Sequence, residues 1–385
     1  MALTAFDSIT EIPFNGSPRP TLGVELEVQI VDPTTFNLTS GSTQILDRVG
    51  DHPKIKQELT QSTVEIITGI CDTVADARAD LSETFGTLYD IGDELGFTFA
   101  SAAMHPFAQW REQDIFPNER YEQLVQRIQW PARRLLIYGL HVHVGVESGE
   151  KAIAVMNGLT TFLPHLLALS ASSPYADHED SGLASTRTKI FEGMPTAGLP
   201  YRLANYSEFQ QFMNTLIRAG AIQTIREIWW DIRPHPGFGT LEIRICDAPS
   251  TLTETMALVA LVQSLVVWLS ECYDKGHPMT ILRPWIVREN KWRACRNGLD
   301  AVVITSNTGD QRPLRESIPA LLAELESYAH RLHCFAELQT VRRILQRGAS
   351  YERQRVVHSG ATGNELDRLA AIVANLANEL RADVV

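Results

Sequence analysis

Residues 22–30 read LGVELEVQI, a stretch in which apolar residues alternate with polar or acidic ones from Val24 onward. Successive residues of a β-strand point to opposite faces of a sheet. Glu25 and Glu27 would therefore share one face, and the apolar residues around them would fill the other. The alternation predicts a strand with one face buried in a core and one face that is acidic.

Four further segments repeat this alternation of apolar and ionisable residues. They are residues 63–68 (TVEIIT), 140–146 (LHVHVGV), 230–233 (WDIR) and 241–246 (LEIRIC). On one sheet, the ionisable residues that share a face would be Glu25, Glu27, Glu65, His141, His143, Asp231, Arg233, Glu242 and Arg244. By the same alternation Cys246 would also face this side, where we expect it only to pack. A face so rich in carboxylates and imidazoles indicates a site for cations and an anionic substrate.

The composition argues against two classes of partner. The chain has 385 residues, of which 44% are hydrophobic, so a sizeable core is expected. Its net charge of −12 argues against a nucleic-acid or anionic-membrane partner, because both require a basic surface. A small anionic substrate stays compatible with this charge, since bound metal ions can invert the local charge of an acidic pocket.

The cysteines and the N-terminal residues predict a cytoplasmic protein. The five cysteines are odd in number and form no CxxC pair, which is typical of reduced thiols. The first residues lack the basic start and apolar core of a secretion signal. The longest apolar run, 256–269, is shorter than the roughly 20 residues that span a bilayer, and it predicts a buried helix.

The order of the segments predicts one α+β domain over residues 1–385, with no linker-like break. A helix is expected from about residue 73 to 95, with Asp72 as its cap and Gly96 at its end. Residues 170–200 form a long stretch without periodicity, and we expect a lid loop over the active site. The alternative is a solvated or disordered insertion. Apolar faces on the last helices are expected to pack or to form an oligomer surface, with a homodimer as one arrangement.

The ionisable face has the chemistry of a metal and phosphate site. Mg²⁺ prefers carboxylate oxygens, and Mn²⁺ also accepts imidazole. Like charges ~4 Å apart repel by about 4 kcal/mol at an effective dielectric near 20, so some glutamates must be protonated or paired with cations. Arg233 and Arg244 can bind phosphate or carboxylate among these acids. Acids for metal and arginines for an anion are typical of phosphoryl transfer, whereas a cross-strand ion-pair lattice is the structural alternative.

Short nucleotide and hydrolase motifs are absent from the sequence. It contains no GxxxxGK[ST], GxGxxG, GxSxG or HExxH pattern. ATP use therefore cannot be inferred from a local motif. Only resemblance to a family implies it.

The strands described above resemble those of the type 2 glutamate–cysteine ligases, also described as YbdK-like carboxylate–amine ligases of the glutamine synthetase-like superfamily. The matching segments are 21–31 (TLGVELEVQIV), 65–69 (EIITG), 139–146 (GLHVHVGV), 185–187 (STR), 195–200 (PTAGLP), 231–247 (DIRPHPGFGTLEIRICD) and 289–298 (ENKWRACRNG). The resemblance spans nearly the whole chain in the expected order.

This resemblance implies a fold and a reaction. The fold is a curved, largely antiparallel sheet flanked by helices, with the active site in its concave funnel. In the reaction ATP phosphorylates a carboxylate, typically the γ-carboxylate of glutamate. An amine then attacks the acyl phosphate, and an amide, ADP and phosphate result. The implied cofactors are ATP and Mg²⁺, with Mn²⁺ as an alternative, and the implied partners are an amino acid and an amine.

The resemblance also implies residue roles. The implied metal ligands are Glu25, Glu27, Glu65, His141 and Glu242. His143 would contact phosphate or metal, and the two histidines could exchange roles. Arg233 and Arg244 would grip the transferred phosphoryl group and the substrate carboxylate, while Arg187 on the lid would be a further anion contact.

The chain departs from the family pattern in the expected lid. An Asn-Ser-Pro followed by aromatic residues is expected, whereas residues 172–180 read SSPYADHED, which is acidic. Because residues of this loop are expected to touch substrate, the departure bears on the identity of the acid or amine.

Two other functions fit the residues alone. The first is a metal-dependent hydrolase that uses two ions and a bound water. The second is a non-catalytic metabolite-binding protein on a ligase scaffold. Turnover without ATP would favour the first, and nucleotide binding without turnover would favour the second.

Overall fold

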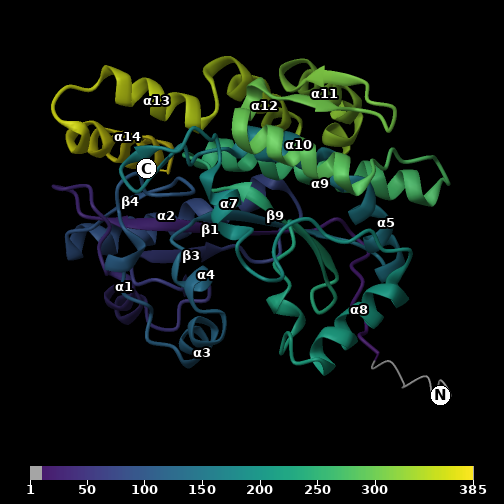
Figure 1. Ribbon diagram of the computed structural model, residues 1–385, viewed down its shortest axis with the longest axis horizontal. Coiled ribbons are helices and arrows are strands. Elements are labelled where there is room, and N and C mark those ends of the chain that lie inside the picture. Colours follow the sequence, from purple (N-terminus) through teal and green to yellow (C-terminus); the bar gives the residue numbers. More distant parts are fainter. Residues whose placement is uncertain (1–10, 385) are drawn as a thin grey trace.

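A seven-stranded sheet forms the centre of the computed structural model, which describes residues 11–384 (Figure 1). Its strands are β1 Leu22–Val31, β2 Ile55–Gln57, β3 Thr63–Ile67, β4 Thr98–Ala100, β5 Gly139–Gly145, β8 Ile232–His235 and β9 Thr240–Asp247. The strand order is β2-β3-β1-β5-β9-β8, and β4 pairs with the end of β1. All of these pairings are antiparallel, which confirms the predicted sheet type.

The predicted alternation decides which face of β1 is buried. Leu22, Val24 and Leu26 are buried, whereas Glu25 and Glu27 are half-buried on the other face. The register places Glu25 opposite His141 on β5, and Glu27 opposite Glu65 on β3. The ionisable residues of neighbouring strands therefore lie side by side, as predicted from the separate segments.

Helices cover the sheet and complete the core. They are α1 Ser42–Val49, α2 Val74–Leu95, α3 Glu119–Ile128, α4 Trp130–Arg133, α5 Gly149–Leu159, α6 Leu163–Ser170, α7 Thr186–Phe191, α8 Tyr206–Arg218, α9 Leu252–Asp274, α10 Pro284–Asn297, α11 Leu314–Arg331, α12 Phe335–Arg347, α13 Ser350–Gly360 and α14 Glu365–Val384. Short 3₁₀ turns occupy Trp110–Glu112, Thr160–Phe162, Ile225–Glu227 and Gly298–Asp300. Helices α2, α5, α6 and α9 pack on the central strands. Figure 1 shows the C-terminal helices α11–α14 above these strands, with α3 and α8 on the other side.

Helix α2 shows how closely the sequence sets its ends. Its start at Val74 and its end at Leu95 match the predicted helix over 73–95. The predicted cap at Asp72 is wrong, because the Thr73 side chain accepts from the Asp76 backbone and forms a capping box. Gly96 ends the helix in the left-handed conformation, at φ 76°, as glycine readily does.

Two helical segments are long and apolar enough to cross a membrane by length and composition. They are Gly149–Ser170 and Leu252–Asp274. In each segment most of the apolar 18-residue stretch is buried inside the protein, 78% in the first and 83% in the second. The same test is passed by the core helices of soluble proteins. The second segment, α9, is the buried helix predicted from the apolar run at 256–269.

Strand β9 carries a bulge that changes one predicted orientation. Leu140 pairs with Cys246, but Val142 pairs with Ile243, so two residues of β9 face His141. Beyond this bulge the alternation of β9 shifts by one residue. Cys246 therefore lies opposite Leu140 in the core and is fully buried. Its predicted orientation toward the ionisable face is wrong.

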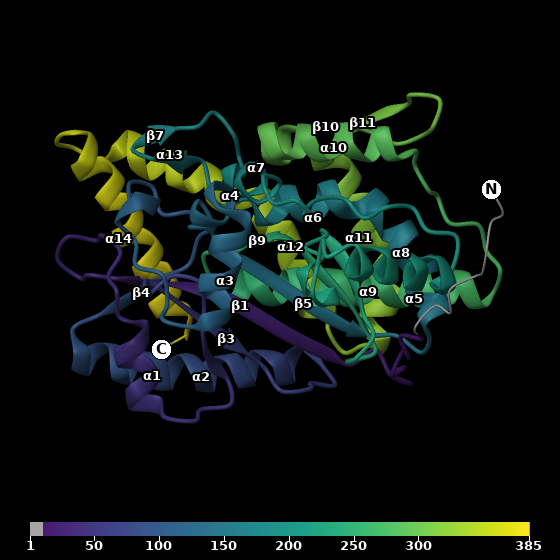
Figure 2. The same ribbon diagram turned by 60° about the horizontal axis from the view of Figure 1, so that its bottom comes forward.

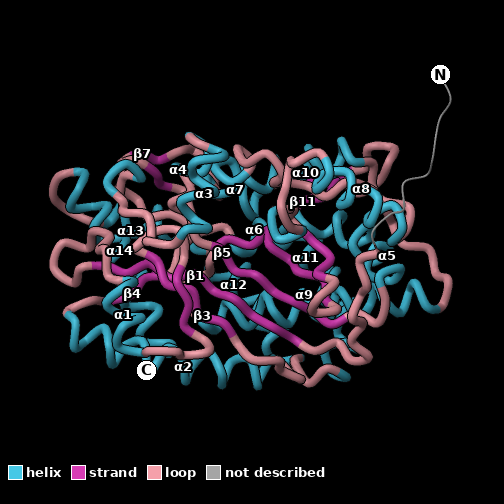
Figure 3. Tube along the Cα trace, turned by 90° about the horizontal axis from the view of Figure 1, so that it is seen from below, coloured by secondary structure: helices cyan, strands magenta, loops and turns pink. Residues whose placement is uncertain are grey.

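The segment 170–200 is folded against the core rather than extended into solvent. It contains the short pair β6 Tyr175–Ala176 and β7 Glu179–Asp180, followed by α7. The side chains of Ser173 and Ser185 donate to the Asp247 carboxylate at 2.9 Å each. In Figures 2 and 3, β7 lies at the rim of the molecule, apart from the central strands. Movement of this segment as a lid stays a prediction.

One apolar cluster connects distant parts of the described chain. It includes residues from Leu22 to Leu380 and draws on the sheet and on α2, α5, α6, α9, α11 and α12. The prediction of a single domain over 1–385 stays a prediction, and residues 1–10 and 385 lie outside the described residues.

Candidate active site

The ionisable face of the sheet lines a cavity of about 370 Å³. Among the residues that line it are Glu25, Glu27, Glu65, His141, His143, Arg187, Arg233, Glu242 and Arg244. The metal-ligand, anion-contact and catalytic residues predicted from the sequence therefore surround one space. The opposite walls come from α3, from α7 and the residues after it, and from residues 226–229.

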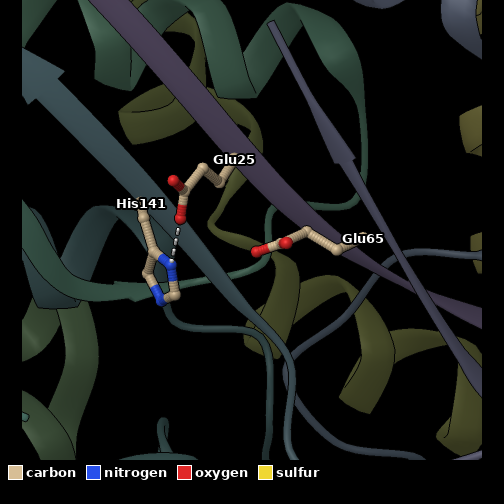
Figure 4. Close-up of side chains that lie close together, drawn as sticks. All are labelled: Glu25, Glu65 and His141. Atoms are coloured by element: carbon tan, nitrogen blue, oxygen red, sulfur yellow. Dashed lines mark hydrogen bonds and ion pairs between the residues drawn. The ribbon is translucent and has the colours of Figure 1, made fainter. Parts of the chain in front are cut away.

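Glu25 lies between the two histidines of β5. His141 Nδ1 is 3.2 Å and His143 Nε2 is 3.3 Å from different oxygens of the Glu25 carboxylate. Burial raises the pKa of Glu25, but the two imidazoles outweigh it and hold this pKa below its ordinary value. Figure 4 shows the Glu65 carboxylate reaching into the same space as Glu25 and His141. Glu25 is therefore an ionised carboxylate with two imidazole nitrogen atoms beside it.

A second acidic group lies toward the β2 side of the cavity. It consists of Glu27, Glu58 and Glu65, whose carboxylates approach within 4.8 Å of one another. Burial, together with the charge of Glu58, raises the pKa of Glu27 to about 8. Burial also raises the pKa of Glu65, again with a contribution from Glu58. Without cations, these carboxylates can share the space only by taking up protons.

The residues present fit divalent cations. The ligand atoms in each of three groups lie within 4.8 Å of one another. The groups are Glu25–Glu65–His141, Glu25–His143–Glu242 and Glu27–Glu58–Glu65. The His143 Nε2 atom is buried and makes no hydrogen bond, although a carboxylate is nearby. A cation with carboxylate and imidazole ligands would satisfy this nitrogen and neutralise the acids.

The other end of the cavity holds charges that are already paired. Arg233 donates to Glu242 Oε2 from Nε at 2.8 Å and from Nη2 at 2.5 Å, and Arg244 pairs with the other oxygen. Burial raises the pKa of Glu242, but Arg244 and Arg233 hold it well below its ordinary value. Glu242 therefore anchors both arginines, in addition to its predicted place in a metal group.

The two arginines differ in what they can still bind. Arg233 uses its remaining nitrogen, Nη1, to donate to the backbone oxygens of Arg226 and Ile228 at 2.8 and 3.1 Å. Arg244 has a buried Nε without a hydrogen-bond partner. Because the Arg244 guanidinium lines the cavity and is not fully hydrogen-bonded, it can pair with an anion there, whereas Arg233 mainly holds Glu242 in place.

Arg187 crosses the bulge in β9. Its Nη1 and Nη2 atoms donate to the backbone oxygens of Ile245 and Arg244 at 3.3 and 3.2 Å. The guanidinium also packs so close to Gly139 that a Cβ there would lie 2.4 Å from Nη2. Arg187 therefore lines the cavity as predicted, but two of its nitrogen atoms hold the strand that carries Arg244.

Comparison with known proteins decides the family. The sequence model of the protein family described as glutamate-cysteine ligase family 2 matches residues 21–371. The chain belongs to this family. A relative named "Putative glutamate–cysteine ligase 2-1" from Frankia alni is 46% identical over 96% of this chain and 97% of its own length. Another relative, named "Putative glutamate–cysteine ligase 2", from Gloeobacter violaceus is 46% identical over 95% of this chain and 98% of its own length.

Solved structures of low sequence identity share the fold of this family 2 ligase. A glutamate–cysteine ligase from Francisella tularensis, solved in complex with AMP, matches at a TM-score of 0.65 and 13% identity, over 96% of this chain and 94% of that chain. A bifunctional glutathione synthetase from Pasteurella multocida matches at a TM-score of 0.65 and 13% identity. That match covers 95% of this chain and 53% of the synthetase chain. The predicted fold and the predicted class, an ATP-dependent carboxylate–amine ligase that forms a carbon–nitrogen bond, are confirmed.

One sequence-based expectation about the site of this family 2 ligase is wrong, and another stays a prediction. Asp231 does not line the cavity, because it precedes β8 and its carboxylate accepts from Lys291 Nζ at 2.7 Å. None of residues 172–180 lines the cavity, and their expected contact with substrate stays a prediction. Asp180 instead accepts two hydrogen bonds from Arg355 on α13, at 2.8 and 3.0 Å.

Several cavity residues were missed from the sequence. They are Glu58, Arg120, Tyr121, Arg226, Trp229, His235 and Phe238. His235 could have been found, because it continues the alternation through Arg233 on β8. Glu58 follows a strand of only three residues, which carries almost no pattern. Arg120 and Tyr121 lie on α3, and only the tertiary fold brings that helix over the sheet.

Proposed function

We propose that this ligase joins the γ-carboxylate of a glutamate-type acid to an amine through an acyl phosphate, with Mg²⁺ held by the acidic residues. One observation supports the proposal most. A group of clustered carboxylates and an arginine pair, one guanidinium of which is not fully hydrogen-bonded, share one cavity. The names of the relatives make glutamate and cysteine the first pair to test.

Each end of the cavity has a separate task in this proposal. Glu25, Glu27, Glu58, Glu65 and His141 would hold the cations, with His143 and Glu242 at the junction. Bound Mg²⁺ would neutralise the triphosphate and hold its oxygens in place for transfer. Arg244, which lines the cavity, would contact the phosphoryl group through its guanidinium, and Glu242 would keep that guanidinium oriented.

The reaction balances without a protein nucleophile. A carboxylate oxygen of the acid attacks the γ-phosphorus of ATP, and the bond to ADP breaks. The amine then attacks the activated carbonyl carbon and loses a proton, and phosphate leaves with the carboxylate oxygen. The chain contributes positioning and charge stabilisation to both steps, which agrees with the absence of a nucleophile–base motif in its sequence.

The exposed aromatic ring of Phe238 is proposed as a nucleobase contact. This ring is 60% exposed, lines the cavity and stacks on His235 with centroids 4.1 Å apart. Aromatic rings held in place in this way are common platforms for bases. Phe238 lines the cavity together with Arg226 and Arg233, whose charges would compensate those of the phosphates.

An ADP-release assay tests the proposed function. Purified protein with ATP and Mg²⁺ is offered glutamate with cysteine, and then a panel of other acids and amines. ADP release that requires both the acid and the amine supports the proposal. ADP release from no pair would overturn it, and product formation in ATP-free buffer would favour a hydrolase. Calorimetry showing nucleotide binding without any turnover would favour a non-catalytic binding protein.

Cellular location and assembly are proposed on separate grounds. We infer a cytoplasmic location, which the five free cysteines support. We also infer a homodimer, which the exposed Val356 on α13 and Leu366 on α14 support, at 71% and 49% exposure. Sedimentation of the purified protein tests the dimer, and a monomer at micromolar concentration would contradict it.

A further inference from the structure

A second cavity of about 630 Å³ lies outside the active site. Its walls include four aromatic side chains, which are Tyr201, Phe212, Trp230 and Trp292. Trp230 is buried, whereas Tyr201 and Trp292 are 63% and 42% exposed. The volume falls in the range of small-molecule sites, which are typically concave and lined with aromatic residues.

The two cavities share a thin wall. Trp229 lines the active site, while its neighbour Trp230 lines the second cavity. In the same way Met194 faces the active site and Pro195 faces the second cavity. The two strips of chain are joined by hydrogen bonds, because Asp231 N donates to the Gly198 oxygen at 2.7 Å. A molecule in the second cavity would therefore press on residues that also shape the active site.

A buried ion group fixes this wall. Lys291 on α10 is 2% exposed, and its Nζ lies 2.7 Å from Asp231 and 2.8 Å from Glu192. Lys189 also pairs with Glu192 at 2.7 Å. The carboxylates of the wall are thus already neutralised by lysines, which leaves no open acid on this side of the cavity.

Arg288 gives the second cavity an open positive charge. It lines the cavity one helical turn before Trp292, on the exposed face of α10. Within residues 11–384, no hydrogen bond or ion pair to its guanidinium is found. Lys189 lies 5.2 Å from the ring centroid of Trp292, so the cationic and aromatic surfaces are contiguous. In a chain of net charge −12, this combination is suited to an anion with a flat apolar body.

We propose that the second cavity is an effector site for a small aromatic carboxylate. The ring of the ligand packs against Tyr201 and Trp292, and its carboxylate pairs with Arg288. Binding changes turnover through the shared wall at residues 194–198 and 229–231. The effect on turnover rests on the proposed ligase function, whereas the binding site stands independently of it.

Tryptophan fluorescence with phenylacetate as the probe tests the binding site. Saturable quenching by phenylacetate is expected, with little response to phenylacetamide, which lacks the charge, or to acetate, which lacks the ring. Arg288→Gln should weaken phenylacetate binding about tenfold, because one charge-assisted contact is lost. Arg296→Gln is the matched control, since Arg296 is exposed on the same helix but does not line the cavity.

The possible results distinguish failure of the proposed effector site from failure of the proposed ligase function. No saturable quenching at millimolar phenylacetate, or equal binding by the Arg288→Gln and wild-type proteins, overturns the proposed site. In ADP-release assays, phenylacetate should change the rate of wild-type and Arg296→Gln protein but not of Arg288→Gln protein. An unchanged rate in an active enzyme overturns the effector role. If the protein releases no ADP with any substrate pair, the ligase proposal fails, and the fluorescence titration still decides the site.

Discussion

The acidic end and the arginine end of the active-site cavity differ in how their charges are balanced. At the acidic end, the carboxylates of Glu27, Glu58 and Glu65 lie within 4.8 Å of one another, and burial raises the pKa of all three. At the arginine end, each oxygen of Glu242 is paired with a guanidinium. The first region needs protons or cations to be stable, whereas the second is stable as it is.

This difference shows which part of the cavity is prepared in advance. Burial together with neighbouring charge raises the pKa of Glu27 to about 8, while Arg244 and Arg233 outweigh burial and lower the pKa of Glu242. The arginine end is therefore preorganised for an anion before any ligand binds. The acidic end is completed only when cations arrive, which would couple metal binding to substrate binding.

The largest expected effect comes from removing the carboxylate that pairs with both arginines at the arginine end. Replacing Glu242 by Gln leaves two buried arginines without their carboxylate partner. Removing one partner of a buried pair typically costs about 3–5 kcal/mol, so we expect a loss of this size in the free energy of unfolding. Denaturant titration measures it, with Glu271→Gln as the control, because the pairs of Glu271 with Lys275 and Arg331 lie at the surface and should each contribute less than about 1 kcal/mol. Equal losses in the two variants would contradict the comparison.

A smaller structural effect but a full loss of activity is expected at Glu25. Gln at this position keeps the shape of the side chain but removes the anion shared by His141 and His143. We expect ADP release to fall by about 10³-fold or more, with the melting temperature little changed. The assay is ADP release with the best substrate pair. A near-normal rate would remove Glu25 from the proposed metal site.

Mg²⁺ should stabilise the protein through its acidic end. At a concentration about 100 times the dissociation constant, a ligand that binds only the folded state adds about 2.7 kcal/mol. We expect thermal melts to show this gain in wild-type protein and a smaller gain in Glu58→Gln. Glu83→Gln, at an exposed position on α2, should keep the full gain. A Mg²⁺ effect of the same size in all three proteins would place the cations elsewhere.

The smallest effect is expected outside both ends, in the acidic loop at 177–180. Asp180→Asn removes an exposed ion pair with Arg355, which typically contributes less than about 1 kcal/mol. Because this loop does not line the cavity, turnover and substrate preference should be unchanged. A several-fold change in preference between amines would show that the loop reaches the substrate.

The sequence predicted the sheet better than the complete site. An alternation of period two is a local pattern, and it placed Glu25, Glu65 and His143 on one face because neighbouring strands share that face. The bulge at Arg244 is not encoded by alternation, since it depends on Arg187 reaching across from α7. Asp231 misled the prediction because it lies one residue before the strand begins.

The remaining site residues depend on contacts that no local pattern reveals. Arg120 and Tyr121 reach the cavity only because α3 packs over the sheet, and Glu58 follows a strand too short to recognise. The resemblance to a family supplied ATP and the amide bond, which the strands alone did not. The division of the cavity into an acidic end and an arginine end became visible only in the structure.

Transfer of labelled oxygen from the acid to phosphate tests the proposed reaction most directly. Glutamate with isotopically labelled carboxylate oxygens is incubated with ATP, Mg²⁺, an amine that supports turnover and the purified protein. If the carboxylate is activated as an acyl phosphate, the inorganic phosphate released will carry one labelled oxygen for each amide formed. Phosphate without the label, in a reaction that still forms the amide, would contradict the mechanism.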